Sequence, residues 1–204
     1  MMKNDYNQSL DNLYEENTNK ENKEEFNLVG EIIEMIIYFL VVLILFLLLQ
    51  FFVGQHIEVN GKSMENTLSD KDHLILEKVS YRFRDPARFD IIVFRPFDTN
   101  EDKDTYYIKR IIGLPGESVQ IIDGQILIND KVLEENYGNE IIANAGIASE
   151  KIILSDDEYF LLGDNRNNSS DSRCKAIGPV KRDVIIGRAW TRIWPLKDIE
   201  ILDH

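Results

Sequence analysis

The chain has 204 residues, of which 44% are hydrophobic and 29% charged, and its formal net charge is -13. A chain this acidic has little electrostatic attraction for nucleic acid, so we expect no nucleic-acid partner. Its single cysteine excludes an intramolecular disulfide. With only three histidines besides, the chain has little material for a cysteine- or histidine-based metal centre, and we expect neither a metal nor another cofactor.

An acidic tail opens the chain, and we assign it to residues 1–31. Residues 1–27 carry three lysines and seven acidic side chains, are rich in asparagine and glutamate, and contain almost no branched apolar side chains. Such a segment cannot bury enough apolar surface to offset the entropy that it would lose on ordering. The composition therefore predicts a disordered tail.

An apolar run follows at 32–53. Between Met35 and Val53 only Gln50 is strongly polar. A helix over these residues would rise roughly 28 Å, close to the thickness of bilayer hydrocarbon, and it would have no polar face. A cleaved signal peptide is the alternative, but the preceding segment is acidic and residues 54–57 offer no small-x-small cleavage pattern. The pattern predicts an uncleaved transmembrane helix.

From residue 54 onward, short apolar runs alternate with turn residues, a pattern typical of a mainly β domain. The runs are rich in isoleucine, valine, phenylalanine and tyrosine, and glycine, proline, asparagine and aspartate bound them. Asp123-Gly124 lies between two runs and is a strong hairpin signal. Residues 141–153 are ambiguous. The predicted strands are 73–76, 90–94, 106–112, 119–122, 125–128, 158–162 and 184–193.

The segment 59–68 offers a candidate nucleophile. Ser63 follows a strand-like stretch and a glycine, Gly61, that lets a peptide backbone approach closely. A break after Met64 can expose the Ser63 hydroxyl and amide. A serine beside a glycine is, however, usually no more than part of a turn.

A lysine inside an apolar strand is the second candidate. Alternate residues of a strand share a face, so Tyr107, Lys109 and Ile111 point the same way. An ammonium among apolar neighbours is disfavoured relative to the neutral amine, so we expect the pKa of Lys109 to fall. A lysine whose pKa is brought from about 10.4 to nearer 8 is a competent general base. The alternative is a lysine that extends from a sheet edge into solvent.

A dense polar loop at 163–173 is the third candidate. It follows an apolar strand, and its aspartates and asparagines favour turns. Asp164, Arg166, Asp171 and Arg173 can form mutual ion pairs that brace a site. An ordinary solvated loop is the alternative.

Together, and in this order after a membrane span, these segments resemble bacterial type I signal peptidases (leader peptidases). The family's serine box, Ser-Met-x-Pro-Thr, corresponds to 63–67, and its second box, Gly-Asp-Ile-Val-Val-Phe, to 89–94. The third box, Lys-Arg-Val/Ile-Ile-Gly-Leu-Pro-Gly-Asp/Glu, corresponds to 109–117. The fourth, Gly-Asp-Asn-Arg-Asp-Asn-Ser-x-Asp-Ser-Arg, corresponds to 163–173. The third and fourth boxes are highly specific.

Two positions depart from the family pattern. Asn66 stands where the serine box usually has proline, and we expect this change to loosen the chain after the nucleophile. Asn167 stands where the fourth box usually has aspartate, which removes one possible ion pair. Neither departure touches Ser63 or Lys109.

The resemblance implies both a fold and an activity. A single N-terminal transmembrane helix would precede a mainly β, mostly antiparallel catalytic domain at 54–204 (a signal peptidase/LexA-like β fold). The protein would be a membrane-bound serine endopeptidase that removes N-terminal signal peptides from secreted preproteins after small-x-small, Ala-x-Ala-like sites. Ser63 would be the nucleophile and Lys109 its neutral general base.

By the same resemblance, other residues support the site. Ser169 would orient the base lysine, Asp164 would pair with Arg110, and Asp171 would pair with Arg173. The Ser63 N–H would donate to the oxyanion. Some relatives add a hydroxyl two residues before the nucleophile, where this chain has Gly61. Small apolar pockets for the −1 and −3 substrate side chains would be lined by Val59, Met64, Leu68, Tyr107 and Ile108.

The resemblance also implies a location. The positive-inside rule does not decide the orientation of the span, because Lys20 and Lys23 lie near one end of it and Lys62 and Lys71 near the other. The family is single-pass in the cell membrane, with a cytoplasmic N-terminus and an extracytoplasmic catalytic domain. Ser63 follows the predicted span by about ten residues, which reach at most about 33 Å. The expected partners are therefore the lipid bilayer and preprotein signal peptides that emerge from it.

Three other functions stay open at this point. One is a Ser-Lys protease with a narrow clientele, such as pilin-like or self-cleaved membrane proteins. Another is a non-catalytic relative that assists surface assembly, although such a protein would be expected to lose the serine or the lysine. A Ser-His enzyme using His56 or His73 is the third, and it leaves the lysine in its apolar run unexplained. Cys174 is expected to be a buried, small apolar residue.

Overall fold

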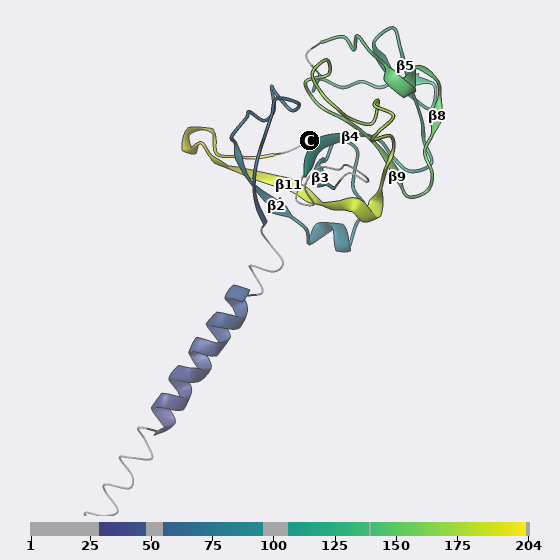
Figure 1. Ribbon diagram of the computed structural model, residues 1–204. Helices are drawn as coiled ribbons and strands as arrows, with labels where there is room; N and C mark the ends of the chain where they lie inside the picture. Colours follow the sequence, from purple (N-terminus) through teal and green to yellow (C-terminus); the bar gives the residue numbers. More distant parts are fainter. Residues whose placement is uncertain (1–28, 48–54, 96–105, 139, 203–204) are drawn as a thin grey trace, which may run out of the picture. The chain divides into compact units, whose positions relative to one another are not determined.

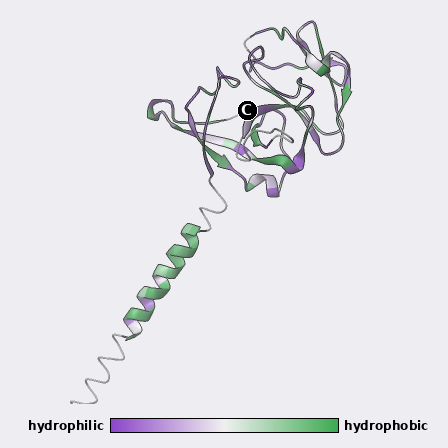
Figure 2. Cartoon of the chain, viewed as in Figure 1, coloured by the Kyte–Doolittle hydropathy of each residue, from purple (hydrophilic) through white to green (hydrophobic). Residues whose placement is uncertain are grey.

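A computed structural model describes residues 29–47, 55–95, 106–138 and 140–202 (Figure 1). The chain divides into two units, Met1–Leu49 and Gln50–His204. The described part of the first unit is one 19-residue helix, Val29–Leu47, whose side chains are exposed and largely apolar (Figure 2). Its length and composition suit a membrane span. The helix begins three residues before the predicted start at 32, so residues 29–31 of the predicted disordered tail are helical. Residues 1–28 of that tail and residues 48–53 of the predicted span lie outside the described residues.

The second unit is built on two antiparallel sheets, which confirms the predicted mainly β, mostly antiparallel fold. The larger sheet has the order β1 (Gln55–Glu58), β2 (His73–Glu77), β11 (Ile185–Trp194), β3 (Ile91–Phe94), β4 (Tyr107–Gly113), β9 (Glu158–Leu162) and β10 (Val180–Lys181), with β12 (Glu200–Ile201) paired to β11. The smaller has the order β7 (Lys131–Val132), β6 (Gln125–Ile128), β5 (Ser118–Ile122) and β8 (Ile152–Ile153). Within the described residues, four short 3₁₀ helices connect strands: η1 (Ser80–Arg82), η2 (Gly146–Ser149), η3 (Arg182–Val184) and η4 (Leu196–Asp198).

All seven predicted strands are present, and their ends differ from the prediction by no more than one residue. The predicted hairpin is confirmed, since Ile122 pairs with Gln125 and both turn residues have positive φ, 51° at Asp123 and 77° at Gly124. That geometry matches the turn that Asp-Gly favours. The ambiguous segment 141–153 proves to be irregular chain with η2 and the short β8.

Strand β4 lies at the centre of the second unit and separates two buried clusters. Ile111 belongs to one cluster with Phe94 of β3, and Ile112 to the other with Phe160 of β9. Successive β4 side chains therefore enter different cores, as the strand period requires. Because both faces of β4 are packed, a polar side chain on this strand must either find a partner or be held out of water.

Candidate active site

Ser63 lies in the connection between β1 and β2. The Val59 N–H donates to the Asp72 carbonyl (2.8 Å), and the Lys71 N–H donates to the Val59 carbonyl (2.8 Å). These two hydrogen bonds hold the two ends of the connection together. Met64 and Leu68 anchor it from below, since both are fully buried in one apolar cluster with Val59. The loop that carries Ser63 is therefore fixed by hydrogen bonds at its ends and by apolar packing in its middle.

Asn66 favours the turn after Ser63 rather than loosening it, contrary to the sequence expectation. The Thr67 N–H donates to the Met64 carbonyl (3.1 Å), which makes Asn66 the third residue of a β-turn. Its φ is 90°. Asparagine tolerates a positive φ at this turn position, whereas proline is locked near −65° and cannot adopt it. The departure from the family pattern therefore agrees with the local backbone of this chain.

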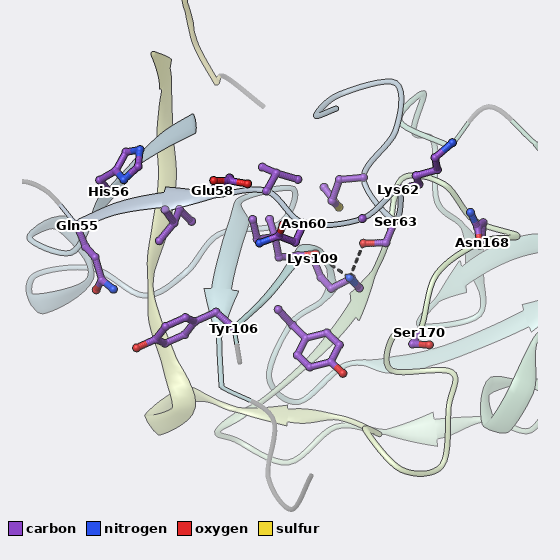
Figure 3. Close-up of a pocket in the computed structure, with 16 residues that line it drawn as sticks. Gln55, His56, Glu58, Asn60, Lys62, Ser63, Tyr106, Lys109, Asn168 and Ser170 are labelled. Carbon is purple, nitrogen blue, oxygen red and sulfur yellow. Dashed lines mark hydrogen bonds between the residues drawn. The ribbon is translucent and has the colours of Figure 1, made fainter. Parts of the chain in front are cut away.

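Lys109 projects from β4 towards Ser63. Its Nζ lies 2.7 Å from Ser63 Oγ and 2.9 Å from the Ile108 carbonyl oxygen, and the ring centroid of Tyr107 is 5.6 Å away. Figure 3 shows the amine and the hydroxyl joined by a hydrogen bond (dashed line), although 46 positions separate the two residues in the chain. The structure thus brings together the two residues that the sequence singled out for chemistry.

The environment of Lys109 lowers the pKa of its amine. The residue is only 3% exposed, and burial, which penalises the charged form, lowers its pKa from 10.5 to about 8. The negative charges of Asp171 and Asp164 oppose this effect but do not cancel it. An amine with such a pKa is partly neutral near physiological pH, and the neutral form can accept the proton of a hydroxyl within hydrogen-bond reach.

Arg110, the next residue along β4, points away from Lys109 and forms a buried ion pair. Its Nε and Nη2 donate to the two carboxylate oxygens of Asp164 (2.9 and 2.7 Å), and the exposed fractions of the two side chains are 1% and 0%. Thr67 Oγ1 donates to the same carboxylate at 2.6 Å, which ties the Ser63 loop to the pair. The ring of Tyr137 stacks 3.7 Å from the guanidinium carbon, a contact that the sequence did not suggest.

The polar loop 163–173 forms the second predicted pair. Arg173 donates through Nε and Nη2 to both oxygens of Asp171 (2.8 Å each), and Asp171 also accepts the Gly163 N–H at 3.1 Å. Arg166 differs from the expectation of mutual pairing within the loop. It pairs instead with Glu135 (2.6 and 2.9 Å), whose segment packs against the loop.

Ser169 does not make the predicted contact with Lys109. Its Oγ is buried and has no hydrogen-bond partner among the described residues. It packs closely on Gly163, where a Cβ would lie 2.3 Å from Ser169 Oγ and 2.5 Å from the Ser63 carbonyl oxygen. Glycine at 163 therefore permits the close approach of the segments that carry Ser63 and Ser169.

A groove of about 800 Å³ runs past the Ser63–Lys109 pair. Four of the five predicted pocket residues line it: Val59, Met64, Tyr107 and Ile108. Leu68 does not line the groove; it is fully buried in the apolar cluster that anchors the loop. Residues that the sequence did not single out also line the groove, among them Ile57, Tyr106, Asn168 and Ser170.

His56, His73 and Cys174 take no part in the Ser63–Lys109 pair. His56 Nε2 lies 2.7 Å from His73 Nδ1, so the two rings contact each other. Within the described ranges, no histidine hydrogen-bonds to Ser63 Oγ. The structure therefore gives no geometric basis for a Ser-His pair. Cys174 is exposed rather than buried, because the chain turns outward directly after Arg173.

Sequence comparison places the chain in a family. A family model described as "Signal peptidase, peptidase S26" matches residues 32–194. The chain belongs to this family. The relatives of this signal peptidase include the "Probable signal peptidase I-2" of Synechocystis sp., 44% identical over 74% of this chain and 68% of that protein. The "Signal peptidase I" of Leptolyngbya laminosa is 45% identical over 71% of each chain. The "Signal peptidase I P" of Bacillus subtilis subsp. natto is 32% identical over 88% of this chain and 96% of that one.

The resemblance noted from the four boxes is thereby confirmed at the level of family and enzyme class. The protein is a signal peptidase I, a hydrolase of peptide bonds. Its apolar helix Val29–Leu47 is consistent with a membrane protein.

Proposed function

We propose that this signal peptidase removes signal peptides from preproteins by a Ser-Lys mechanism, with Ser63 as nucleophile and Lys109 as general base. The observation that carries the proposal is the 2.7 Å separation between Ser63 Oγ and a Lys109 amine that is only 3% exposed. A serine hydroxyl is a weak nucleophile until a nearby base accepts its proton. The buried amine, with its pKa lowered to about 8, is a base of suitable strength.

In the acylation step, Ser63 Oγ attacks the carbonyl carbon of the scissile peptide bond while its proton passes to Lys109 Nζ. The tetrahedral oxyanion accepts a hydrogen bond from the Ser63 N–H. When the peptide C–N bond breaks, Lys109 returns the proton to the leaving amine, which becomes the new N-terminus of the mature protein.

In the deacylation step, a water molecule loses a proton to the now neutral Lys109 amine and attacks the acyl-enzyme. The second tetrahedral intermediate collapses, the bond to Ser63 Oγ breaks, and Lys109 returns the proton to that oxygen. The signal peptide leaves with a new carboxylate, and the enzyme regains its starting state.

The substrate adds to the groove as an extended strand. One wall is β1, an edge strand, and its continuation to Asn60; the other is the first half of β4, which β9 pairs with only from Arg110 onward. Strand addition supplies main-chain hydrogen bonds, and the apolar lining by Val59, Met64 and Ile108 receives alternate side chains. Shallow pockets admit alanine, glycine or serine at −1 and −3 and exclude larger groups by steric clash.

The enzyme acts at a membrane, with the helix as a single-pass anchor, the N-terminus in the cytoplasm and the catalytic body on the extracytoplasmic side. Two observations support the anchor: the helix is 19 residues long and its exposed surface is largely apolar. The orientation follows from the family resemblance. The short chain between the span and Ser63 limits the substrates to those held at or emerging from the bilayer.

Replacing Ser63 by alanine tests the nucleophile. In the full chain in detergent micelles, we expect Ser63→Ala to cleave an Ala-x-Ala preprotein at least about 10³-fold more slowly than the wild type. Ser149→Ala, at an exposed position of helix η2, should retain wild-type turnover. Gel analysis and N-terminal sequencing of the product measure both rate and cleavage position.

Three results would each contradict part of the proposal. Turnover by Ser63→Ala within about tenfold of the wild type would remove Ser63 as the nucleophile. Equal cleavage of preproteins with alanine or tryptophan at −1 would remove the small-pocket specificity. Cleavage confined to a specialised pilin-like substrate would replace the general clientele by a narrow one.

The pH dependence of kcat/KM tests the base. Because the base must be neutral, we expect kcat/KM to rise with pH through an apparent pKa of about 8 and to fall about tenfold per unit below it. The measurement is the initial rate at low preprotein concentration between pH 6 and pH 10, roughly two units to either side. A limb centred near 6.5, the usual pKa of a free histidine, would instead rule out Lys109 as the base.

A further inference from the structure

Asn165 contacts the two carbonyl groups that flank Ser63 in the chain. Its Nδ2 donates to the Lys62 carbonyl oxygen at 3.0 Å, and its backbone N–H donates to the Ser63 carbonyl oxygen at 3.1 Å. The same Nδ2 lies 3.3 Å from Glu65 Oε2. One residue of the polar loop 163–173 thus holds successive peptide groups of the Ser63 loop from one side.

The Lys62 carbonyl and the Ser63 N–H belong to the same peptide group. This bond is trans, since the only cis peptide among the described residues is Trp194–Pro195. In a planar trans peptide the C=O and N–H point in opposite directions. The Lys62 carbonyl also accepts the Glu65 N–H of its own turn at 3.1 Å. Asn165 acts together with this turn to hold the carbonyl on one side, which directs the Ser63 N–H to the opposite side.

The Ser63 N–H is available for a ligand. Across the part of the chain that the structure describes, neither the Ser63 N–H nor the next donor along the chain, the Met64 N–H, has a hydrogen-bond acceptor. Ser63 itself lines the groove. Gly61 carries no hydroxyl that could supply a side-chain donor, so the backbone donors bear more of the stabilisation of an oxyanion.

The chemistry of the Asn165 contacts requires an amide nitrogen on this side of the group. Both partners of Nδ2, the Lys62 carbonyl and the Glu65 carboxylate, are acceptors only. If the side-chain amide of Asn165 were flipped, its Oδ1 would face the Lys62 carbonyl oxygen and the Glu65 carboxylate oxygen. An aspartate has the same shape but no donor, and it would repel both partners.

We propose that Asn165 is a positioning residue for the oxyanion site: by holding the Lys62–Ser63 peptide group, it directs the Ser63 N–H at the developing oxyanion. This inference rests on the proposed function, because it assumes that Ser63 is the nucleophile. Asn165 touches neither the substrate nor the reacting atoms, so its effect appears in the transition state rather than in substrate binding.

The test compares Asn165→Asp and Asn165→Ala with the wild type, using the full chain in detergent micelles. We expect kcat on an Ala-x-Ala preprotein to fall about 100-fold in Asn165→Asp and about tenfold in Asn165→Ala, with KM changed less than about threefold. Both variants keep the backbone bond from residue 165 to the Ser63 carbonyl. The matched control is Asn167→Asp, because the Asn167 side chain binds the segment 140–143 and not the Ser63 loop. It should keep the wild-type kcat.

A second readout separates positioning from a general structural role. A peptide aldehyde ending in alanine forms a tetrahedral adduct with the nucleophile and probes the oxyanion site directly. Its inhibition constant should rise in Asn165→Asp by about the same factor as kcat/KM falls, while the melting temperature stays within a few degrees of the wild type.

Each outcome decides the matter. A wild-type kcat in Asn165→Asp overturns the inference, and so does a loss of kcat that is matched by a rise in KM and leaves aldehyde inhibition unchanged. The proposed function is judged separately by Ser63→Ala. If Ser63→Ala is inactive and Asn165→Asp is fully active, only the role of Asn165 is wrong; if Ser63→Ala is active, the proposed function itself is wrong.

Discussion

Replacing Lys109 by methionine is expected to abolish peptidase activity and, at the same time, to stabilise the fold. Without the amine, no base accepts the Ser63 proton, and turnover should fall at least about 10³-fold. Folding buries an amine whose pKa drops from 10.5 to about 8. Each pKa unit corresponds to about 1.4 kcal/mol, so at pH 7 the free energy of unfolding should rise on the order of 3 kcal/mol in Lys109→Met.

The pH dependence of this gain follows from the sign of the shift. The unfolded chain binds the Lys109 proton more tightly than the folded one, so the wild type gains stability as the pH rises from about 8 to about 10.5. The advantage of Lys109→Met should therefore be constant below about pH 8 and vanish above about 10.5. Urea unfolding can be followed by the fluorescence of Trp190 and Trp194, the only two tryptophans, both in β11.

The control for this variant is Lys131→Met, at an exposed position of β7. It should change neither turnover nor unfolding appreciably. Activity of Lys109→Met within about tenfold of the wild type would rule out the proposed base. A loss of stability at pH 7 would show that the buried amine does not carry the desolvation penalty that we assign to it.

The second large effect is expected from breaking the buried Arg110–Asp164 pair. In Asp164→Ala, the Arg110 guanidinium stays buried with no carboxylate, and Thr67 loses its acceptor. Removing one partner of a buried pair typically costs about 3–5 kcal/mol, a large share of the stability of a domain of this size. The urea midpoint should fall accordingly, and turnover should fall with it because Thr67 belongs to the Ser63 loop.

Two companion variants sharpen this prediction. Arg110→Met combined with Asp164→Leu should recover much of the lost stability, because neither charge is then buried alone. Lys151→Ala breaks an exposed pair with Asp130 and should change stability by less than about 1 kcal/mol. A loss in Asp164→Ala as small as that of Lys151→Ala would contradict the role of burial.

Local patterns in the sequence determined the secondary structure. The apolar run predicted the helix, and the alternation of branched and aromatic residues with turn residues predicted seven strands to within one residue. Asp123-Gly124 predicted its hairpin for the same reason, because φ preferences are properties of a few neighbouring residues. Five short strands were not predicted. The two-residue strands β7, β8, β10 and β12 carry too little pattern, and β1, with the sequence Gln-His-Ile-Glu, has only one apolar residue.

The candidate site was predictable where motifs carry it and not where distant segments meet. The boxes pointed to Ser63 and Lys109 and to the two aspartate–arginine pairs. They did not reveal that Arg166 binds Glu135, or that Asn165 holds the Ser63 loop from about 100 positions away. From the sequence, an asparagine in a loop predicts only a turn, because the tertiary packing determines which groups its side chain hydrogen-bonds.

By itself, the sequence determined which residue types could do the chemistry: a serine beside a glycine, and a lysine flanked by a tyrosine and an isoleucine on one face of a strand. Only the tertiary structure decided that the lysine is 3% exposed and lies 2.7 Å from the serine. The reason is physical. Dehydration of an amine depends on every segment that covers it, and here a strand, a loop and a groove wall from separate parts of the chain must close together before its pKa falls.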